Sequence, residues 1–354
     1  MHLRNLTSMS AGFSVGMQPD GRRFVVAVVK GTFAFPDRGT RCVLAGEQAP
    51  LVEADTFEGE PGASAPLQEI DFALRKLRCD VLLSGSAHAP GARPAPKVPV
   101  ALKVGALQKQ FQVVGPRAWK RGILTVQPGS PRPFTVMPIS YGNAFGGVDR
   151  TPEDPRKHQT YLENPVGVGF HASAATVADG APLPSTEEID RPVSRPDERY
   201  APMAFGPLGR SWAPRLPLAG TYDQRWLDEV FPFLPADFDD AYHQAAPADQ
   251  QMAFPRGGEE VVLLNLTPEG RAAFRLPDMT MRVTFVRRHH TRIETAPVLD
   301  TIHFEPDARR LSLCWRASAP IRRDLFEIEE ILVSGQSNDL VRASASGAPR
   351  GEGR

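Results

Sequence analysis

The chain has 354 residues, of which 41% are hydrophobic, so it is long enough for roughly two domains with buried cores. Its 41 basic residues balance its 41 acidic residues, and this neutrality leaves no long-range field to attract nucleic acid or an anionic surface. We therefore expect a folded protein whose partners do not include nucleic acid.

The N-terminal stretch indicates where the protein resides. The sequence MHLRNLTSMSAGFSVGMQ lacks the apolar run of a signal peptide. The run FVVAVV at 24–29 is far shorter than the roughly 20 residues that a membrane helix needs. We expect a cytoplasmic protein without membrane insertion.

Residues 1–138 predict an N-terminal β region. The chain contains 35 prolines, about twice the usual ~5%, which favours short strands and fixed loops. Strands are predicted for FVVAVVKGTFAF (24–35) and CDVLLSG (79–85), and for VPVALKVG and LQKQFQVVG, in which apolar and polar residues alternate. Such a period of two is typical of strands with one buried face.

Residues 139–257 predict an irregular central segment that ends in a short helix pair. The part 139–220 is rich in Gly, Pro, Asn, Asp and Ser and shows no sustained periodicity, but its recurring aromatic residues indicate an ordered surface. Helices are predicted at 223–231 and 235–246, each with an Asp near its start and one apolar stripe, so that the pair spans about 223–246.

Residues 258–334 predict a C-terminal β region. Its clearest hairpin, at 300–317, places Ile302, Phe304 and Leu311 on one face. His303 alternates with them, so we expect it to point outward as a polar residue. The low-complexity stretch 335–354 predicts a disordered tail.

These regions together predict a mainly β protein. It has two β-sandwich-like regions, separated by a long irregular Pro/Gly-rich central segment with a short helix pair. The patterns do not tell whether the two β regions fold as separate domains or interleave in one body.

Two motifs have the composition of a chemical site. The glycines of YGNAFGG (141–147) lack the Lys of a phosphate-binding loop, so they are better explained by positive backbone φ. The stretch DFDDAYH supplies Asp237, Asp239, Asp240 and His243, either as helix caps and solvated acids or as a chemical site. No spacing matches a metal motif, so we predict neither a metal nor a cofactor.

Five stretches, taken together, resemble a known family. In order along the chain they are SYGNAFGG, YLENPVGVGF, APMAFGPLGRSWAPR, WLDEVFPFLPADFDDAYHQAAPADQ and DTIHFEPDARRLSLCWRA. They resemble the signature blocks of domain of unknown function 2169, over almost the whole chain. Many members of that family look like adaptors or chaperones of bacterial type VI secretion.

The resemblance implies a non-enzymatic role in protein binding. Such an adaptor binds a secreted effector and helps to load it onto the spike, a VgrG trimer with its PAAR tip. The resemblance leaves open which effector is bound and whether the contact is with the effector, the PAAR tip or VgrG. It supplies no catalytic residues.

The central segment is the predicted partner surface, because Tyr, Trp and Arg dominate binding hot spots. The predicted contact residues are Tyr141, Asn143, Phe145, Arg210 and Trp212. The alternative for the aromatic residues is that they only pin a long loop to the sheet. The rival function is a hydrolase that acts on cell-wall or carbohydrate material through Asp239, Asp240 and His243.

Overall fold

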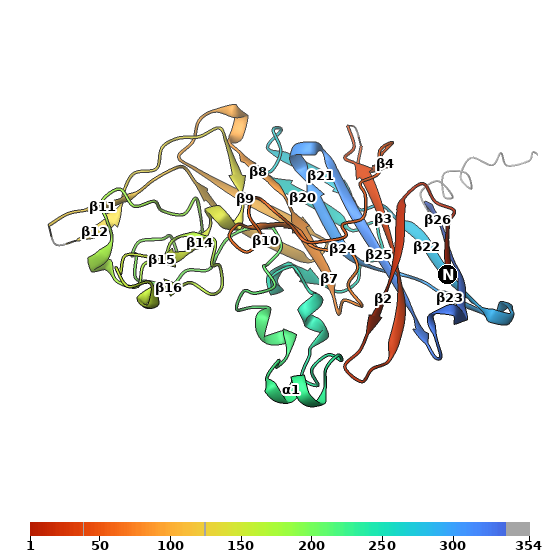
Figure 1. Ribbon diagram of the computed structural model, residues 1–354. Helices are drawn as coiled ribbons and strands as arrows, with labels where there is room; N and C mark the ends of the chain where they lie inside the picture. Colours follow the sequence, from red (N-terminus) through yellow and green to blue (C-terminus); the bar gives the residue numbers. More distant parts are fainter. Residues whose placement is uncertain (38, 124, 338–354) are drawn as a thin grey trace, which may run out of the picture.

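The computed structural model describes residues 1–37, 39–123 and 125–337 and confirms a mainly β protein (Figure 1). The predicted tail 335–354 lies outside the described residues, apart from 335–337, which end strand β26 (Ile328–Ser337). Within the described residues, no helix combines the length and the apolar character that crossing a bilayer requires.

A seven-stranded sheet forms the centre of the molecule. Its strand order is β19-β7-β24-β25-β3-β2, and β4 pairs with β3 off this path. The bounds are β2 (Ser10–Met17), β3 (Arg23–Ala34), β4 (Val43–Leu44), β7 (Cys79–Leu83), β19 (Gln251–Met252), β24 (Val298–Glu305) and β25 (Arg310–Ile321). The predicted hairpin 300–317 is thus β24–β25, and it lies between strands from the N-terminal half.

Two further sheets mix strands from both ends of the chain. The five-stranded sheet has the order β18-β10-β9-β20-β21 and the four-stranded sheet the order β1-β26-β22-β23. Their bounds are β1 (His2–Asn5), β9 (Lys97–Val104), β10 (Leu107–Val114), β18 (Thr186–Glu187), β20 (Glu260–Leu264), β21 (Arg271–Arg275), β22 (Met279–Arg287) and β23 (Arg292–Thr295). The N- and C-terminal β regions therefore interleave.

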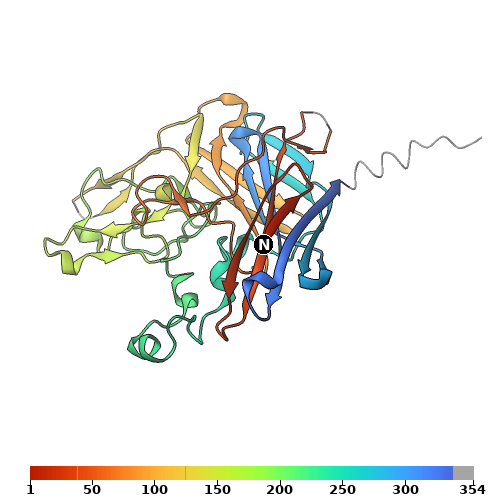
Figure 2. The same ribbon diagram turned by 45° about the vertical axis from the view of Figure 1, so that its right-hand side comes forward.

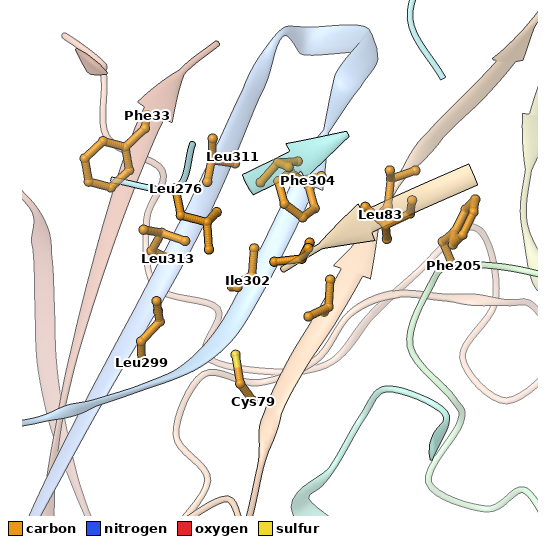
Figure 3. Close-up of a cluster of buried hydrophobic side chains, with 14 of the residues drawn as sticks. Phe33, Cys79, Leu83, Phe205, Leu276, Leu299, Ile302, Phe304, Leu311 and Leu313 are labelled. Atoms are coloured by element: carbon orange, nitrogen blue, oxygen red, sulfur yellow. The ribbon is translucent and has the colours of Figure 1, made fainter. Parts of the chain in front are cut away.

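One face of the seven-stranded sheet forms the main core. Ile302, Phe304 and Leu311 are fully buried on the face that the hairpin's alternation predicted. Figure 3 shows these three side chains together with Leu276 and Leu313. The same cluster includes residues of the other two sheets, such as Val100 and Phe285. Removal of this apolar surface from water, at about 25 cal/mol per Å², is the main stabilising contribution.

The opposite face of this sheet, which we term the polar face, carries buried charged and hydroxyl side chains beside a small apolar cluster, and the chain segment 45–76 covers it. Three buried ion pairs lie there, with N–O distances of 2.9, 2.7 and 2.5 Å: Lys30–Asp71, Lys76–Asp80 and Arg316–Asp300. His303 is on this face, as alternation requires, but the expectation that it points outward is wrong. It is only 9% exposed, and its Nε2 lies 2.9 Å from the Ser84 hydroxyl.

Most of the central segment folds into a lobe beside the sheets, drawn in yellow and green in Figure 1. Short strand pairs hold it together and join it to the body: β8 (Gly85–His88) with β13 (Val136–Ile139), β11 (Trp119–Arg121) with β12 (Val126–Pro128), β14 (Phe145–Gly146) with β17 (Val168–Gly169), and β15 (Val148–Asp149) with β16 (Gln159–Thr160). The pair β5 (Thr56–Phe57) with β6 (Pro66–Gln68) lies within the covering segment 45–76. A second apolar cluster forms the interior of the lobe.

The glycines of YGNAFGG permit two chain segments to cross. Gly146 and Gly147 have φ of 150° and 99°. A β-carbon there would lie 2.2 Å from the Asn164 carbonyl oxygen and 2.3 Å from that of Gly167, respectively. The Asn164 amide donates to the carbonyls of Tyr141 and Phe145 and fixes the crossing. The motif is a structural crossover.

Only the first helix of the predicted pair is an α-helix. Helix α1 (Gln224–Glu229) begins at Asp223, whose carboxylate accepts a hydrogen bond from Trp226 N at 2.8 Å. The stretch 235–246 instead contains one 3-10 turn, η6 (Asp240–His243). The reason is tertiary: Ala245 N donates to the buried Asp80 carboxylate at 2.8 Å rather than to a helical carbonyl.

Candidate partner-binding surface

The three aromatic residues that the sequence proposed as contacts are buried. Tyr141 and Trp212 pack edge to face with their ring centres 5.2 Å apart, in the main core. Phe145 is fully buried in the lobe, 5.1 Å from the rings of both Tyr161 and Tyr200. In this conformation the three rings stabilise the body and the lobe, so a direct partner contact through them stays a prediction.

The two polar residues of the proposed set lie nearer the surface. Arg210 pairs with Asp55 at 2.6 Å and with Glu69 at 2.6 Å. Burial by itself would lower the pKa of the Arg210 guanidinium, but the hydrogen bond to Asp55 and the charge of Glu69 raise it. Asn143 is half-buried, and its side chain donates weakly to Pro138 O at 3.4 Å. Both have structural partners.

The acids of DFDDAYH each have a local partner. Asp237 accepts hydrogen bonds from Thr221, Asp239 caps η6 through Ala241 N, and Asp240 pairs with Arg75. Burial lowers the pKa of His243 to about 4, against the opposing charge of Asp240. Among the described residues, no three His, Cys, Asp or Glu side chains are grouped to hold a metal ion.

The polar face under segment 45–76 has little room for a ligand. Its cavity measures about 30 Å³ and is lined by charged and hydroxyl side chains, among them Lys30, Glu69, Asp71 and Arg316. That volume holds one or two water molecules. The buried ion pairs are therefore suited to fixing the covering segment on the sheet.

A protrusion on the surface has a different character. Residues 216–238, which we term the aromatic knob, consist of α1 and its flanking turns, and they project from the sheets in both views (Figures 1 and 2). Within it, Trp226 packs edge to face against Tyr222 and Phe231, with ring centres 4.7 and 5.6 Å apart. Trp226 Nε1 also donates to Phe233 O at 3.0 Å.

The aromatic knob exposes large apolar side chains to solvent. No residue of α1 is buried, although helices this short depend on packing for their stability. The side chains with 44–62% exposure are Leu216, Tyr222, Leu227, Phe231 and Phe233. Contiguous exposed apolar groups of this kind mark interaction sites on soluble proteins.

Charge on the aromatic knob is acidic. Residues 216–238 contain four acidic side chains and one basic side chain. The acids are Asp223, Asp228, Glu229 and Asp237, and the base is Arg225, which pairs with Glu229 at 3.0 Å. The knob is tied to the body at its base, where Asp239 N donates to Leu218 O at 3.0 Å. It therefore presents apolar anchors within a negative field.

The sequence pattern predicted this helix but not its exposure. The stripe of Trp226, Leu227 and Val230 has the pattern of a core-facing helix, yet none of the three is buried. One signal was present: α1 is short, Pro232 follows it closely, and aromatic residues stand on both sides. A helix this short cannot bury all the apolar surface that these neighbouring aromatic residues add.

Comparison with known proteins identifies the family. A family model described as an uncharacterized protein conserved in bacteria, DUF2169, matches residues 20–316. The chain belongs to the DUF2169 family. No curated protein and no solved structure matches it.

The DUF2169 match places the aromatic knob within the family region. It also contains the lobe and most of the seven-stranded sheet. Strands β1 and β2 precede residue 20, and the turn before β26 follows residue 316, so these parts lie outside the match.

Proposed function

We propose that this DUF2169 protein is a non-enzymatic adaptor or chaperone of bacterial type VI secretion. It binds a secreted effector in the cytoplasm and assists its loading onto the VgrG/PAAR spike. The observation that carries the proposal is the aromatic knob, whose apolar side chains gain a favourable environment only when a partner covers them.

The architecture supports a binding role. The knob is an irregular segment mounted on interleaved sheets, the arrangement in which loops on a rigid scaffold carry function. Trp226 pre-orders Tyr222 and Phe231, so little side-chain entropy is lost when a partner docks. The hydrolase alternative has no comparable support, because Asp239 and Asp240 are held by a cap and an ion pair.

The experiment measures binding to the effector and spike proteins encoded beside the gene. Phe231→Ser should weaken the affinity about thirtyfold, the usual cost of losing an interface anchor. The matched control is Val136→Ser, which alters another exposed apolar residue, 51% exposed against 62% for Phe231, on β13. The proposal fails if none of these proteins binds the chain and effector delivery is intact without it.

A further inference from the structure

Three turns lie in a row that starts beside the aromatic knob: the β2–β3 turn adjoins the knob in Figures 1 and 2, and the other two lie progressively farther from it, toward the right in Figure 1. They connect β2 to β3, β22 to β23 and β25 to β26, and we term them the turn array. Arg23 on β3 donates to Arg323 O at 3.4 Å, and Arg287 on β22 donates to Pro320 O at 2.6 Å. On the other side, a β-carbon at Gly21 would lie 3.4 Å from the Phe233 ring.

The turn array is basic where the knob is acidic. Arg288, Arg322 and Arg323 are exposed, and within the described residues their guanidinium groups have no partner. The acids of these turns are already engaged. Asp20 pairs with Arg22 at 2.6 Å, and Glu327 accepts the backbone N–H groups of residues 322 and 323.

The same turns expose a second apolar anchor. Phe326 is 70% exposed and stands next to the exposed Leu325 in the turn η10 (Leu325–Glu327). Asp324 caps this turn by accepting from Phe326 N at 2.8 Å, which fixes the backbone that presents the ring. Phe and Arg are both enriched in protein–protein interfaces relative to the rest of the surface.

We propose that the aromatic knob and the turn array form one docking surface for a single folded protein. The partner presents basic residues to the knob and acidic residues to the array, and Phe231 and Phe326 serve as apolar anchors. This inference rests on the proposed function only for the identity of the partner, an effector or spike protein.

The two signs of charge decide the class of partner. An anionic bilayer or a nucleic acid is negative throughout, so the acidic knob would be repelled while the arginines were attracted. A protein surface can place both signs in register. The turn 322–327 also lies beyond the DUF2169 match, which suits a contact that distinguishes one partner from another.

The test reverses charge in the turn array. In the double variant Arg322→Glu, Arg323→Glu, the association rate with the purified co-encoded effector or spike protein should fall about tenfold and lose much of its salt dependence. The control is Arg93→Glu, which follows the turn η1 (Pro90–Ala92) at the opposite end of the molecule and is also exposed (Figure 1). Thermal melting should be unchanged in both.

A second variant and two further probes separate the outcomes. Phe326→Ser should weaken the affinity about thirtyfold without affecting melting. If Phe231→Ser weakens binding but neither turn variant does, the proposed function stands and the single docking surface is wrong. If no co-encoded protein binds the unmodified chain and effector delivery is intact without it, both fail.

Other occupants would also overturn the inference. If a second copy of this chain covers the surface, sedimentation of the unmodified chain would show a dimer, and the Arg322→Glu, Arg323→Glu variant would be a monomer. The second measurement is binding to vesicles of phosphatidylglycerol and phosphatidylethanolamine in equal parts, and to duplex DNA. If the chain binds either one and the same variant abolishes that binding, the turn array is a site for a polyanion instead.

Discussion

The lobe and the aromatic knob come from the same irregular segment and both stack aromatic rings, but only the lobe buries them. In the lobe, Phe145 packs edge to face between Tyr161 and Tyr200. In the knob, Trp226 packs in the same way against Phe231, which is 62% exposed. Ring stacking by itself therefore does not make a core.

What separates the two regions is the covering backbone. In the lobe, the Tyr161 hydroxyl donates to Tyr200 O at 3.0 Å, and the Asn164 amide fixes the crossing beside Phe145, so further chain segments close over the rings. The knob has only the turns that flank α1. The comparison teaches that the lobe closes over its own rings, whereas the knob leaves its large apolar side chains exposed, and this exposure is why we propose the knob as a partner surface.

The largest loss of stability is expected when an aromatic ring is removed from the apolar cluster of the lobe. Phe145→Ala should lower the free energy of unfolding by about 3–5 kcal/mol, because it leaves a cavity among three rings. Urea unfolding measures the loss, and partner affinity of the folded fraction should be unchanged. Trp212→Ala should behave alike. Lost affinity at full stability in either variant would instead support the contact role that the sequence proposed.

The pH dependence of stability tests whether the polar face under segment 45–76 is shielded from water. Burial lowers the pKa of His303 to about 4, from about 6.5 in the unfolded chain. As the pH falls through this range the unfolded state binds the proton first, so the free energy of unfolding falls by up to about 3 kcal/mol. His303→Gln should flatten this slope in urea unfolding followed between pH 7 and roughly 4. An unaltered slope would mean that this face is open to water.

An intermediate effect is expected at the centre of the knob. Trp226→Ala removes both ring contacts and the hydrogen bond to Phe233, so the knob should lose its shape while the sheets remain folded. We expect a stability change of about 1 kcal/mol or less and faster proteolysis within 216–238. A large loss of global stability would show that the knob belongs to the core.

The smallest effect on stability is expected at the knob surface. Leu227→Ser should change the free energy of unfolding by no more than about 0.5 kcal/mol, because the side chain is 53% exposed. Val81→Ser, at a fully buried position of β7, is the matched contrast and should cost several-fold more. Similar losses from both variants would break the distinction between surface and core.

The sequence by itself determined the strands and their faces. Apolar runs placed β3 and β7, and period-two patterns placed β9 and β10, close to their observed bounds, and the hairpin's alternation sorted Ile302 and Phe304 from His303. This was possible because alternation of side chains across a strand is a local property of the backbone. The mainly β class followed from it.

Only the tertiary structure decided which faces are covered. His303 is buried because segment 45–76 crosses its face of the sheet, and the predicted helix 235–246 gives way to a 3-10 turn because Asp80 binds Ala245 N. Trp226 and Leu227 have a core-like pattern, but no second layer reaches them. Burial is set by chain segments distant in sequence, and a local pattern carries no record of where those segments go.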